Sequence, residues 1–248
     1  KKINFSLVSK LLRFIFLPYE LFTNLITFFY LRQIISSNYI DTIFSHNGGW
    51  PGGILNRIGL LSSVGMNIKN ILIIHNYPVK KNFFNYLFIK SNDFLINLIK
   101  PKIITVSKSC KKVLISRNHF KKIKVIYNGI DINFKSSKKF KAKSKEIKIS
   151  YFGKIQERKG LHLLIKALNC INFKNVFLNI YGDGDEKYKK KLIMIKNQKG
   201  FVLNFYKPVS NITKFLSLTD ILVLPSIKFE SFGMVLIEAM RQKVPVIC

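Results

Sequence analysis

The stretch IKISYFGKIQERKGLHLLIKAL, residues 147–168, contains an apolar strand-like run, then a glycine turn, then a helix-like segment. A short run rich in Ile that is followed by a turn and a longer apolar segment is typical of a parallel sheet with crossover helices. The same alternation continues along the chain on both sides of this stretch. The sequence therefore predicts an α/β protein.

Nine segments fit the strand pattern, and they form two groups. They are residues 41–45, 71–75, 102–107 and 123–129, and then residues 147–153, 176–182, 201–206, 221–226 and 244–248. The stretch FKSSKKFKAKSKE between the groups has no apolar periodicity and is typical of a linker. We therefore expect an N-terminal α/β domain over residues 1–132, a linker over 133–146 and a C-terminal α/β domain over 147–248.

Both domains are expected to be truncated at the chain ends. Residue 1 precedes a helical segment rather than a first strand, and Cys248 directly follows an apolar strand. Because a parallel sheet is covered by helices on both faces, we expect a further loop and helix after that strand.

The chain is basic, with a formal net charge of +30 over 248 residues, and 48% of its residues are hydrophobic. Such a charge favours an anionic partner, either nucleic acid or a membrane surface. Lys, Asn, Ile and Phe are all frequent, however, so part of the charge can reflect AT-rich coding. Residues 1–145 carry 25 basic and 4 acidic residues, a net charge of +21, so the excess lies in the N-terminal part.

The cysteines and the N-terminal apolar run bear on the cellular compartment. The chain has an odd number of cysteines, and no two of them have C-x-x-C spacing: they are Cys110, Cys170 and Cys248. This pattern favours a reducing cytoplasm. The run FIFLPYELFTNLITFFYL, residues 14–31, is of borderline length for a membrane span and is followed by no signal-peptide cleavage site. We predict a buried or partly interfacial helix, with a membrane-surface anchor and a true span as alternatives.

Ligands of open α/β sheets bind beyond the carboxyl ends of the strands, and a basic turn lies at the end of the strand predicted over residues 147–153. Gly153 allows a tight turn, and Lys154, Arg158 and Lys159 supply positive charge before a helix. A helix N-terminus flanked by lysines suits a diphosphate. A solvated basic turn is the alternative.

Two glutamates follow the strand at residues 221–226. Glu230 lies just before a helix predicted to start at residues 231–233, and Glu238 lies within it. The first amides of a helix favour anions, and carboxylates at such a site accept hydrogen bonds from a vicinal diol such as ribose. The alternatives are a helix-stabilising acid for Glu230 and a solvated face for Glu238.

The segments FGKIQERKG, IYGDGDEK, DILVLPS and ESFGMVLIEAM, in this order, resemble the C-terminal nucleotide-sugar domain of a known family. That family is the retaining glycosyltransferases of family 4, also called glycosyl transferases group 1. VSKSCKK with KVIYNGID, and DTIFSHNGGWPGG with ILIIHNYP, resemble its N-terminal domain. The resemblance covers most of residues 39–248 and implies a fragment of the GT-B fold, which has two Rossmann-like domains.

The resemblance implies donor-binding roles by position. Lys154 and Lys159 match the basic pair that holds the donor diphosphate, although Lys154 stands where arginine is common. Glu230 matches a catalytic-site acid that contacts the donor sugar hydroxyls, and Glu238 matches the acid that holds the ribose diol. The other donor-binding residues that it implies are Gly153, Ser231, Phe232, Gly233 and Met234.

The resemblance also implies roles for residues of the N-terminal domain. His75 matches a catalytic family histidine near the donor sugar and its reacting carbon. His46, Gly48 and Gly49 are candidates on the acceptor side, where the glycines shape a loop. A satisfied surface group is the alternative for a histidine at a strand end.

Asp183 and Asp185 form a D-x-D pair, which holds a divalent metal in the other large glycosyltransferase fold. In the family that this chain resembles, the same turn usually contains Gly-Asp-Gly-Pro. We therefore predict turn formation and helix capping by these residues, and no metal site.

The resemblance implies a metal-independent retaining glycosyltransferase without a cofactor. The donor would be a nucleoside diphosphate sugar and the acceptor a saccharide or lipid-linked molecule, in bacterial surface polysaccharide or lipopolysaccharide synthesis. The enzyme would be cytoplasmic, or peripheral at the inner membrane, with no nucleic acid partner. The alternative is a non-catalytic basic α/β protein that binds nucleic acid or an anionic membrane, although the 22 Phe residues lie mostly in core-like runs.

Overall fold

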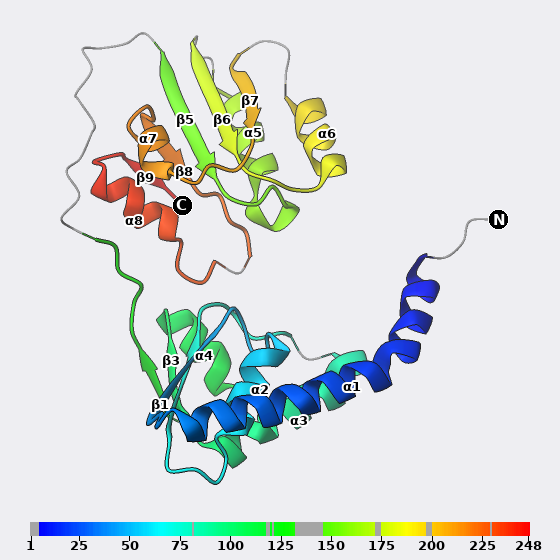
Figure 1. Cartoon of the computed structure of the whole chain (residues 1–248). Helices are drawn as coiled ribbons and strands as arrows, with labels where there is room; N and C mark the ends of the chain where they lie inside the picture. Colours follow the sequence, from blue (N-terminus) through cyan, green and yellow to red (C-terminus); the bar gives the residue numbers. More distant parts are fainter. Residues whose placement is uncertain are drawn as a thin grey trace. The chain divides into compact units, whose positions relative to one another are not determined.

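The computed structural model describes residues 5–80, 82–117, 120, 122–131, 146–171, 175–196, 200–228 and 230–248. For residues 5–17 and Phe84 it describes the backbone alone. The chain divides into two compact units, residues 1–127 and residues 128–248 (Figure 1). The predicted linker over 133–146 lies outside the described residues, apart from Glu146.

The first unit is built on four parallel strands in the order β1-β2-β3-β4. Its elements are α1 (Phe5–Ser37), β1 (Thr42–Asn47), α2 (Ile54–Ser62), β2 (Lys69–Ile74), η1 (Phe83–Asn85), α3 (Tyr86–Ile99), β3 (Lys102–Thr105), α4 (Lys108–Ile115) and β4 (Ile123–Val125). One face of the sheet carries the core, in which Leu72, Ile103 and Leu114 are buried. This order confirms the parallel sheet that the apolar runs predict.

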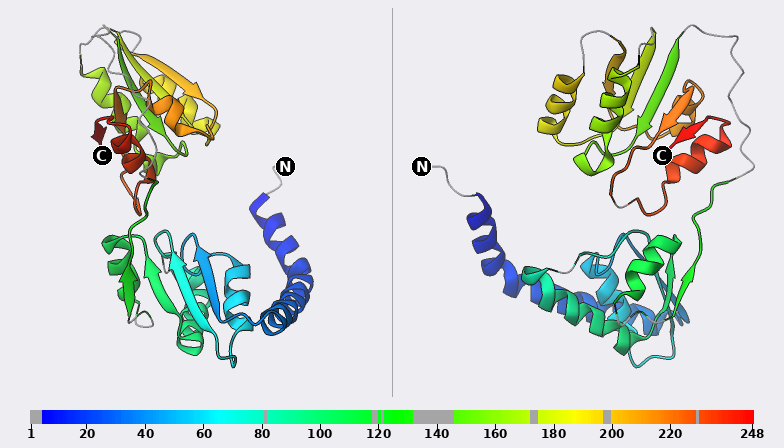
Figure 2. Two further views of the ribbon diagram at one scale, coloured as in Figure 1. Left: turned by 60° about the vertical axis from the view of Figure 1, so that its left-hand side comes forward. Right: turned by 180° about the vertical axis from the view of Figure 1, so that it is seen from behind.

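The predicted N-terminal helix is part of α1, which continues through Pro18. Arg32 ties α1 to the end of α2, because its Nη1 donates hydrogen bonds to the carbonyl oxygens of Ser62 at 3.0 Å and Val64 at 2.9 Å. Figure 2 shows α1 at the side of the first unit, next to α2. Within the described part of the chain, no helix combines the length and apolar character that a membrane span needs.

The second unit is a five-stranded parallel sheet in the order β7-β6-β5-β8-β9. Its elements are β5 (Ile147–Phe152), η2 (Glu157–Lys159), α5 (Leu161–Asn169), β6 (Val176–Tyr181), α6 (Glu186–Ile195), β7 (Val202–Tyr206), α7 (Ile212–Leu216), β8 (Ile221–Val223), α8 (Met234–Arg241) and β9 (Val246–Ile247). Tyr151 of β5 packs with residues of α5 and α6, while Phe152 packs with residues of α7 and α8. Helices thus cover both faces, as in a doubly wound fold.

The strand order of the second unit reverses between β5 and β8. From β5 the chain adds β6 and β7 on one side, and it then adds β8 and β9 on the other. Such a topological switch point is where open α/β sheets bind their ligands, because the loops that follow the two central strands diverge there. The segments that follow β5 and β8 are therefore the place to look for a site.

Candidate functional site

The loops that follow β5 and β8 are in direct backbone contact. Gly160 has φ +71°, and a Cβ atom at this position would overlap the carbonyl oxygen of Pro225. The amide of Ile227 donates a hydrogen bond to the carbonyl oxygen of Arg158 at 3.0 Å. Only glycine permits this approach, since any other side chain would push the two loops apart.

This contact brings together two residues predicted to bind the donor. Lys159, in the loop after β5, donates a hydrogen bond to Oε2 of Glu230, in the segment after β8, and the two side chains form an ion pair. Ser226 Oγ donates to the same oxygen at 3.1 Å. The Lys159 side chain is 13% exposed and that of Glu230 is 30% exposed. Because an ammonium group has three N–H donors, Lys159 keeps donors for a further anion.

The helix that carries Glu238 starts later than the sequence predicts. The expected start was residues 231–233, but α8 begins at Met234, and Gly233 is its N-cap with φ +78°. Helical geometry therefore does not extend back to Glu230, and Ser231 and Phe232 precede the helix. The helix starts one residue after the predicted range, because a glycine in the left-handed region ends the preceding loop. Among the described residues no side chain caps the start of α8, so its first amides are open to an anion.

Glu238 lies in α8 and is half-buried. Burial raises the pKa of its carboxyl group above the ordinary value, and the positive charge of Arg241 partly opposes the rise. Among the described residues, its side chain makes no hydrogen bond and no ion pair with Lys159 or Glu230. The structure thus joins Lys159 to Glu230 and leaves Glu238 apart from that contact.

Tyr151 supports the turn that holds Lys154. Its buried hydroxyl donates a hydrogen bond to the carbonyl oxygen of Lys154 at 2.8 Å, directly after Gly153. Burial and then the negative charge of Glu230 raise the pKa of the Tyr151 phenol, so the hydroxyl stays a donor. The Lys154 side chain is exposed, and within the described ranges it has no hydrogen bond or ion pair. Its ammonium group is available to a ligand.

The D-x-D segment forms a turn and a cap, as predicted. Asp185 is the N-cap of α6 and accepts a hydrogen bond from the Lys187 amide at 2.9 Å, while Asp183 accepts one from the Gly184 amide at 2.9 Å. A Cβ atom on Gly184 would overlap the carbonyl oxygen of Ile155, so this turn lies against the loop after β5. In the part of the chain that the structure describes, no three His, Cys, Asp or Glu residues gather as a metal site would require.

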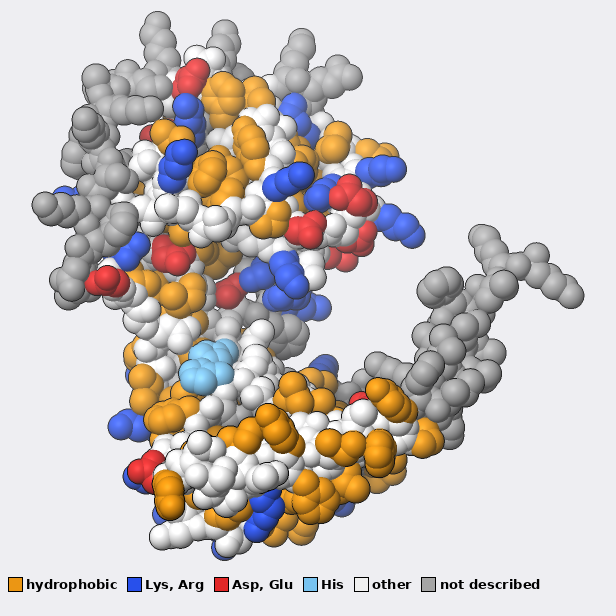
Figure 3. Space-filling view, in the orientation of Figure 1, with side chains coloured by type: hydrophobic (Ala, Val, Ile, Leu, Met, Phe, Trp, Pro, Cys, Tyr) orange, Lys and Arg blue, Asp and Glu red, His pale blue; other side chains and the backbone are white. Residues whose placement is uncertain are grey.

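The first unit carries a pair of histidines at the ends of β1 and β2. His46 Nδ1 and His75 Nε2 are 3.0 Å apart, within hydrogen-bond distance. Burial and the charge of His46 lower the pKa of His75. Histidine side chains, in pale blue, are visible on the surface in Figure 3. The two residues were predicted for separate roles, on the donor and the acceptor side, and the structure brings them into contact.

One of the two glycines in the neighbouring loop is required by packing. A Cβ atom on Gly49 would lie 2.7 Å from the carbonyl oxygen of Tyr77, whereas one on Gly48 would meet no atom within 4 Å. The Val79 amide also donates a hydrogen bond to the carbonyl oxygen of Trp50 at 2.7 Å. The loops after β1 and β2 therefore hold each other in place.

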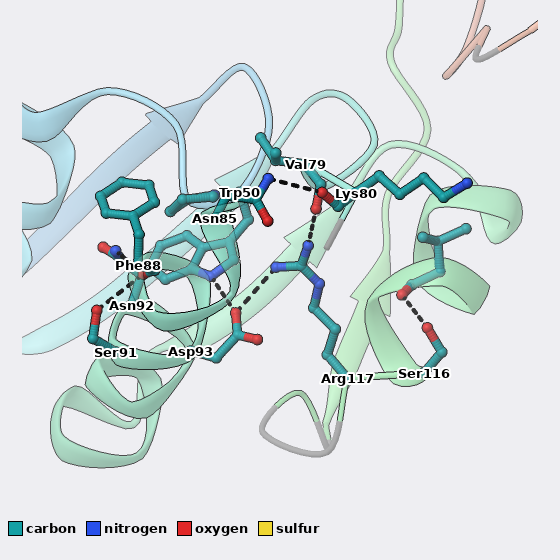
Figure 4. Close-up of polar contacts among 12 residues, drawn as sticks. Trp50, Val79, Lys80, Asn85, Phe88, Ser91, Asn92, Asp93, Ser116 and Arg117 are labelled. Atoms are coloured by element: carbon teal, nitrogen blue, oxygen red, sulfur yellow. Dashed lines mark hydrogen bonds and ion pairs between the residues drawn. The ribbon is translucent and has the colours of Figure 1, made fainter. Parts of the chain in front are cut away.

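A buried polar network anchors these loops to α3 and α4. Trp50 Nε1 donates a hydrogen bond to Asp93 Oδ1 at 2.9 Å, and Arg117 Nη1 donates to the same oxygen at 3.1 Å (Figure 4). The second guanidinium nitrogen of Arg117 donates to the carbonyl oxygen of Val79. Sequence reasoning missed this network. The available signal was that Asp93 is the only acidic residue between Asp41 and Asp131.

Comparison with known families gives two adjoining matches. Residues 6–134 match the family described as Glycosyltransferase Family 4. Residues 133–248 match the family described as Glycosyl transferases group 1. Together these matches span both units.

Two known proteins illustrate the similarity in sequence. The uncharacterized glycosyltransferase MJ1607 of Methanocaldococcus jannaschii is 31% identical over 176 residues, which cover 64% of this chain and 45% of that protein. The capsular polysaccharide biosynthesis glycosyltransferase CapH of Staphylococcus aureus is 27% identical over 219 residues, which cover 84% of this chain and 59% of that protein. The chain thus spans about half the length of these relatives.

Solved structures share the fold. A glycosyltransferase from Rickettsia africae ESF-5 superposes with a TM-score of 0.70 at 19% identity, over 91% of this chain and 62% of that chain. Anabaena Alr3699/HepE, solved in complex with UDP, gives a TM-score of 0.64 at 21% identity, over 87% of this chain and 62% of that chain. Both neighbours are GT-B glycosyltransferases, which confirms the predicted fold class of two Rossmann-like domains.

Proposed function

The chain belongs to glycosyltransferase family 4, and from that premise we propose that it transfers a sugar from a nucleoside diphosphate sugar to an acceptor. The observation that carries the proposal is the contact between Lys159 and Glu230 at the switch point of the second sheet. This contact places a cation and a carboxylate side by side beyond the carboxyl ends of β5 and β8, where an α/β sheet binds nucleotides. HepE has been solved with UDP and with UDP-glucose, which supports a donor of this class.

In this proposal the candidate site residues of the second unit have distinct tasks. Lys159 and Lys154 hold the diphosphate, together with the uncapped amides at the start of α8. Glu238 accepts hydrogen bonds from the ribose diol, which gives its half-buried carboxylate a partner. Glu230 orients the sugar by accepting hydrogen bonds from its hydroxyls and forms no covalent bond with it.

Nucleotide binding tests these tasks. Isothermal titration with a panel of nucleoside diphosphates should show binding weaker by about tenfold to a hundredfold for Lys159→Ala, since a hydrogen bond to a charged group contributes about 1.5–3 kcal/mol. Glu238→Ala should weaken the binding of nucleoside diphosphates but leave the binding of inorganic diphosphate unchanged. Lys166→Ala is the matched control, because it removes an equal charge from an exposed position in α5. Equal affinity in all three variants would contradict the proposal.

We also propose that transfer retains the anomeric configuration of the donor. In the family mechanism the acceptor attacks the face from which the diphosphate leaves, and the donor phosphate helps to take the acceptor proton. Proton NMR of the product formed at early times checks this, because the anomeric coupling constant distinguishes the two configurations. Product of inverted configuration would refute retention while leaving the transfer itself intact.

The acceptor in this proposal is a saccharide or lipid-linked molecule of bacterial surface polysaccharide or lipopolysaccharide synthesis. The name of CapH, a capsular polysaccharide biosynthesis glycosyltransferase, supports a role of this kind. Hydrolysis of the donor, screened over a panel of nucleotide sugars, would identify the sugar and base first. Acceptors can then be tested with the donor that is cleaved fastest.

The outer face of α1 supports a membrane location for the acceptor. Phe22, Leu25, Ile26 and Phe29 are each more than half exposed, and Figure 3 shows apolar side chains along this helix. Exposed apolar helix faces bind the headgroup region of membranes, and the net charge of +21 on residues 1–145 favours anionic lipids. We therefore propose that the protein docks peripherally on an anionic inner membrane.

Sedimentation with vesicles tests this location. Binding to vesicles that contain phosphatidylglycerol, and weaker binding to pure phosphatidylcholine, is expected for the unaltered protein. Phe22→Ser with Phe29→Ser should reduce binding, whereas Tyr39→Ser, which changes an exposed aromatic residue beyond α1, should not. Equal binding by both variants, or none by the unaltered protein, would exclude α1 as a membrane surface.

A further inference from the structure

The histidine pair of the first unit suggests a role for His46 that goes beyond a place near the acceptor. We propose that His46 is a positioning residue, which fixes the ring orientation and the tautomer of His75 through one hydrogen bond. The inference rests on the transferase function proposed above and on the family resemblance, which implies that His75 lies near the donor sugar. His46 itself then needs no contact with a substrate.

The ring geometry is that of a hydrogen bond rather than of a metal chelate. His46 Nδ1 and His75 Nε2 lie 3.0 Å apart, the ring centroids are 5.3 Å apart and the ring planes differ by 14°. The distance between the two ring centroids exceeds the distance between the two nitrogens by about two ring radii, which is one centroid-to-nitrogen distance for each ring. Both nitrogens therefore lie close to the line that joins the two centroids. An N–H on one ring therefore points along the lone pair of the other. Two ligands of one metal would instead direct both lone pairs toward a third point.

This arrangement restricts the protons that the pair can hold. One proton lies between the two facing nitrogens, so neutral rings adopt one of two linked tautomers. When Nδ1 of His46 donates, His75 carries its own proton on Nδ1, and when His75 donates from Nε2, its Nδ1 is an acceptor. The two rings cannot both be protonated without placing two N–H groups against each other.

The backbone of His46 is held independently of His75. Asn56 Nδ2, on α2, donates a hydrogen bond to the carbonyl oxygen of His46 at 2.8 Å, and Ser45 Oγ donates to Asn56 Oδ1 at 3.2 Å. The His75 amide donates to the carbonyl oxygen of Asn47 at 2.8 Å, which continues the β1–β2 register. A residue that is fixed in this way can hold its neighbour, which is what positioning requires.

The electrostatic surroundings of His75 point the same way. Among the described groups, His46 is the one titratable residue whose charge acts on His75, and burial acts in the same direction. The neighbouring side chains of Ser45, Asn47, Asn56 and Asn76 are uncharged. His75 is therefore kept neutral near neutral pH, as a hydrogen-bonding group beside a sugar should be.

Nitrogen-15 NMR of the histidine rings tests the pair without any substrate. The chain has only four histidines, so single substitutions assign every ring signal. In His46→Phe, which keeps the bulk and removes the nitrogen, the pKa of His75 should rise toward its ordinary value and its tautomer ratio should change. In His46→Asn, whose amide occupies the place of Nδ1, the tautomer of the unaltered protein should be restored. The same pKa and tautomer of His75 in all three proteins would overturn the inference.

His162 provides the internal control for these spectra. It lies in the second unit, where its Nδ1 is 2.8 Å from the Tyr188 hydroxyl, so its signals should be unchanged in both variants. A change at His162 would indicate that the variant is misfolded. In that case the test rests on the His46→Asn protein, which keeps a polar side chain at position 46.

Kinetics separates a positioning role from a merely structural one. His46→Phe should lower kcat about tenfold or more with little change in KM for the donor. It should also move the acidic limb of the pH profile of the rate to higher pH. His46→Asn should restore both kcat and the position of this limb. Altered NMR signals with unchanged kinetics would overturn the positioning role. If no protein, including the unaltered one, transfers or hydrolyses a sugar, then the proposed function fails, and with it the role of His46 in transfer.

Discussion

Glu238 is a carboxylate whose surroundings favour its protonated form, since burial raises its pKa above the ordinary value. A group with a raised folded-state pKa contributes stability that is present below the unfolded pKa and is lost as pH rises through the folded pKa. We therefore expect Glu238→Gln to raise the Tm relative to the unaltered protein at pH about 7, and to change it little at pH about 4. The same variant should bind nucleoside diphosphates more weakly. Thermal unfolding at both pH values, together with titration calorimetry, checks this pair of effects.

Glu157, in the same unit, is a control because its pKa is shifted in the direction opposite to that of Glu238. Its hydrogen bond with Lys191 lowers the pKa of its carboxyl group, so any stability that it contributes is lost as pH falls. Glu157→Gln should therefore lower the Tm slightly at pH about 7, because an exposed ion pair contributes little. If both glutamine variants shifted the Tm in the same direction, burial of Glu238 would not be the cause.

Asp93 and Arg117 form an ion pair that is almost fully buried, at 0% and 6% exposure. Asp93→Asn should destabilise the first unit by about 3–5 kcal/mol, because the Arg117 charge is then buried without its partner. Replacing both residues, as Asp93→Leu with Arg117→Met, should recover part of the loss, because the unpaired charge is removed although the Trp50 N–H and the Val79 carbonyl lose their partners. Trp50 is the only tryptophan in the chain and bonds to Asp93, so its fluorescence during urea unfolding reports on this unit. A double variant as unstable as the single one would rule out the unpaired charge as the cause.

At the scale of elements, Gly160 holds the loop after β5 against the loop after β8. Gly160→Ala should separate these loops and break the contact between Lys159 and Glu230, which weakens nucleotide binding about tenfold or more. Gly200→Ala is the matched control, because Gly200 also has a positive φ, at +126°, but a Cβ atom there would meet no described atom within 4 Å. Titration calorimetry of both variants separates close approach from backbone strain. Equal loss in both would attribute the effect to strain alone.

The strands were predictable as elements because buried parallel strands are continuous apolar runs, and β5 and β6 begin at the predicted residues. The start of α8 was not predictable in the same way. The residues from Ser231 to Met234 carry no strong helix-breaking signal other than one glycine. A Cβ atom on Gly233 would lie 3.0 Å from Leu236 Cδ1 and 3.3 Å from Leu224 Cδ2, so the surroundings of this glycine come from tertiary packing. Local propensity fixes such a boundary poorly when tertiary contacts determine it.

Contacts between elements explain the rest of what the sequence missed. His46 and His75 are 29 positions apart, and they meet because β1 and β2 pair in a register that places His46 opposite Ile73. A shift of one residue would turn one ring to the other face of the sheet. The family motif supplied the identity of each residue, but only the register supplies their contact. The contact of Lys159 with Glu230 depends in the same way on the pairing of β5 with β8, which places the segments after these two strands side by side.

For the molecule as a whole, the balance of charge determines how the diphosphate that leaves in the proposed transfer would be neutralised. Residues 146–248 carry 17 basic and 8 acidic residues, and Lys154 and Lys159 lie at the switch-point loops. Lysine charge and helix amides can then do the work that a divalent metal does elsewhere. We therefore expect sugar transfer to proceed at an unchanged rate after dialysis against EDTA, and Lys159→Gln to lower it at least tenfold with or without added Mg²⁺. Loss of activity on chelation, restored by Mg²⁺ or Mn²⁺, would show instead that a metal shares the diphosphate. In that case Asp183 would be the first residue to substitute, since Asp185 already caps α6.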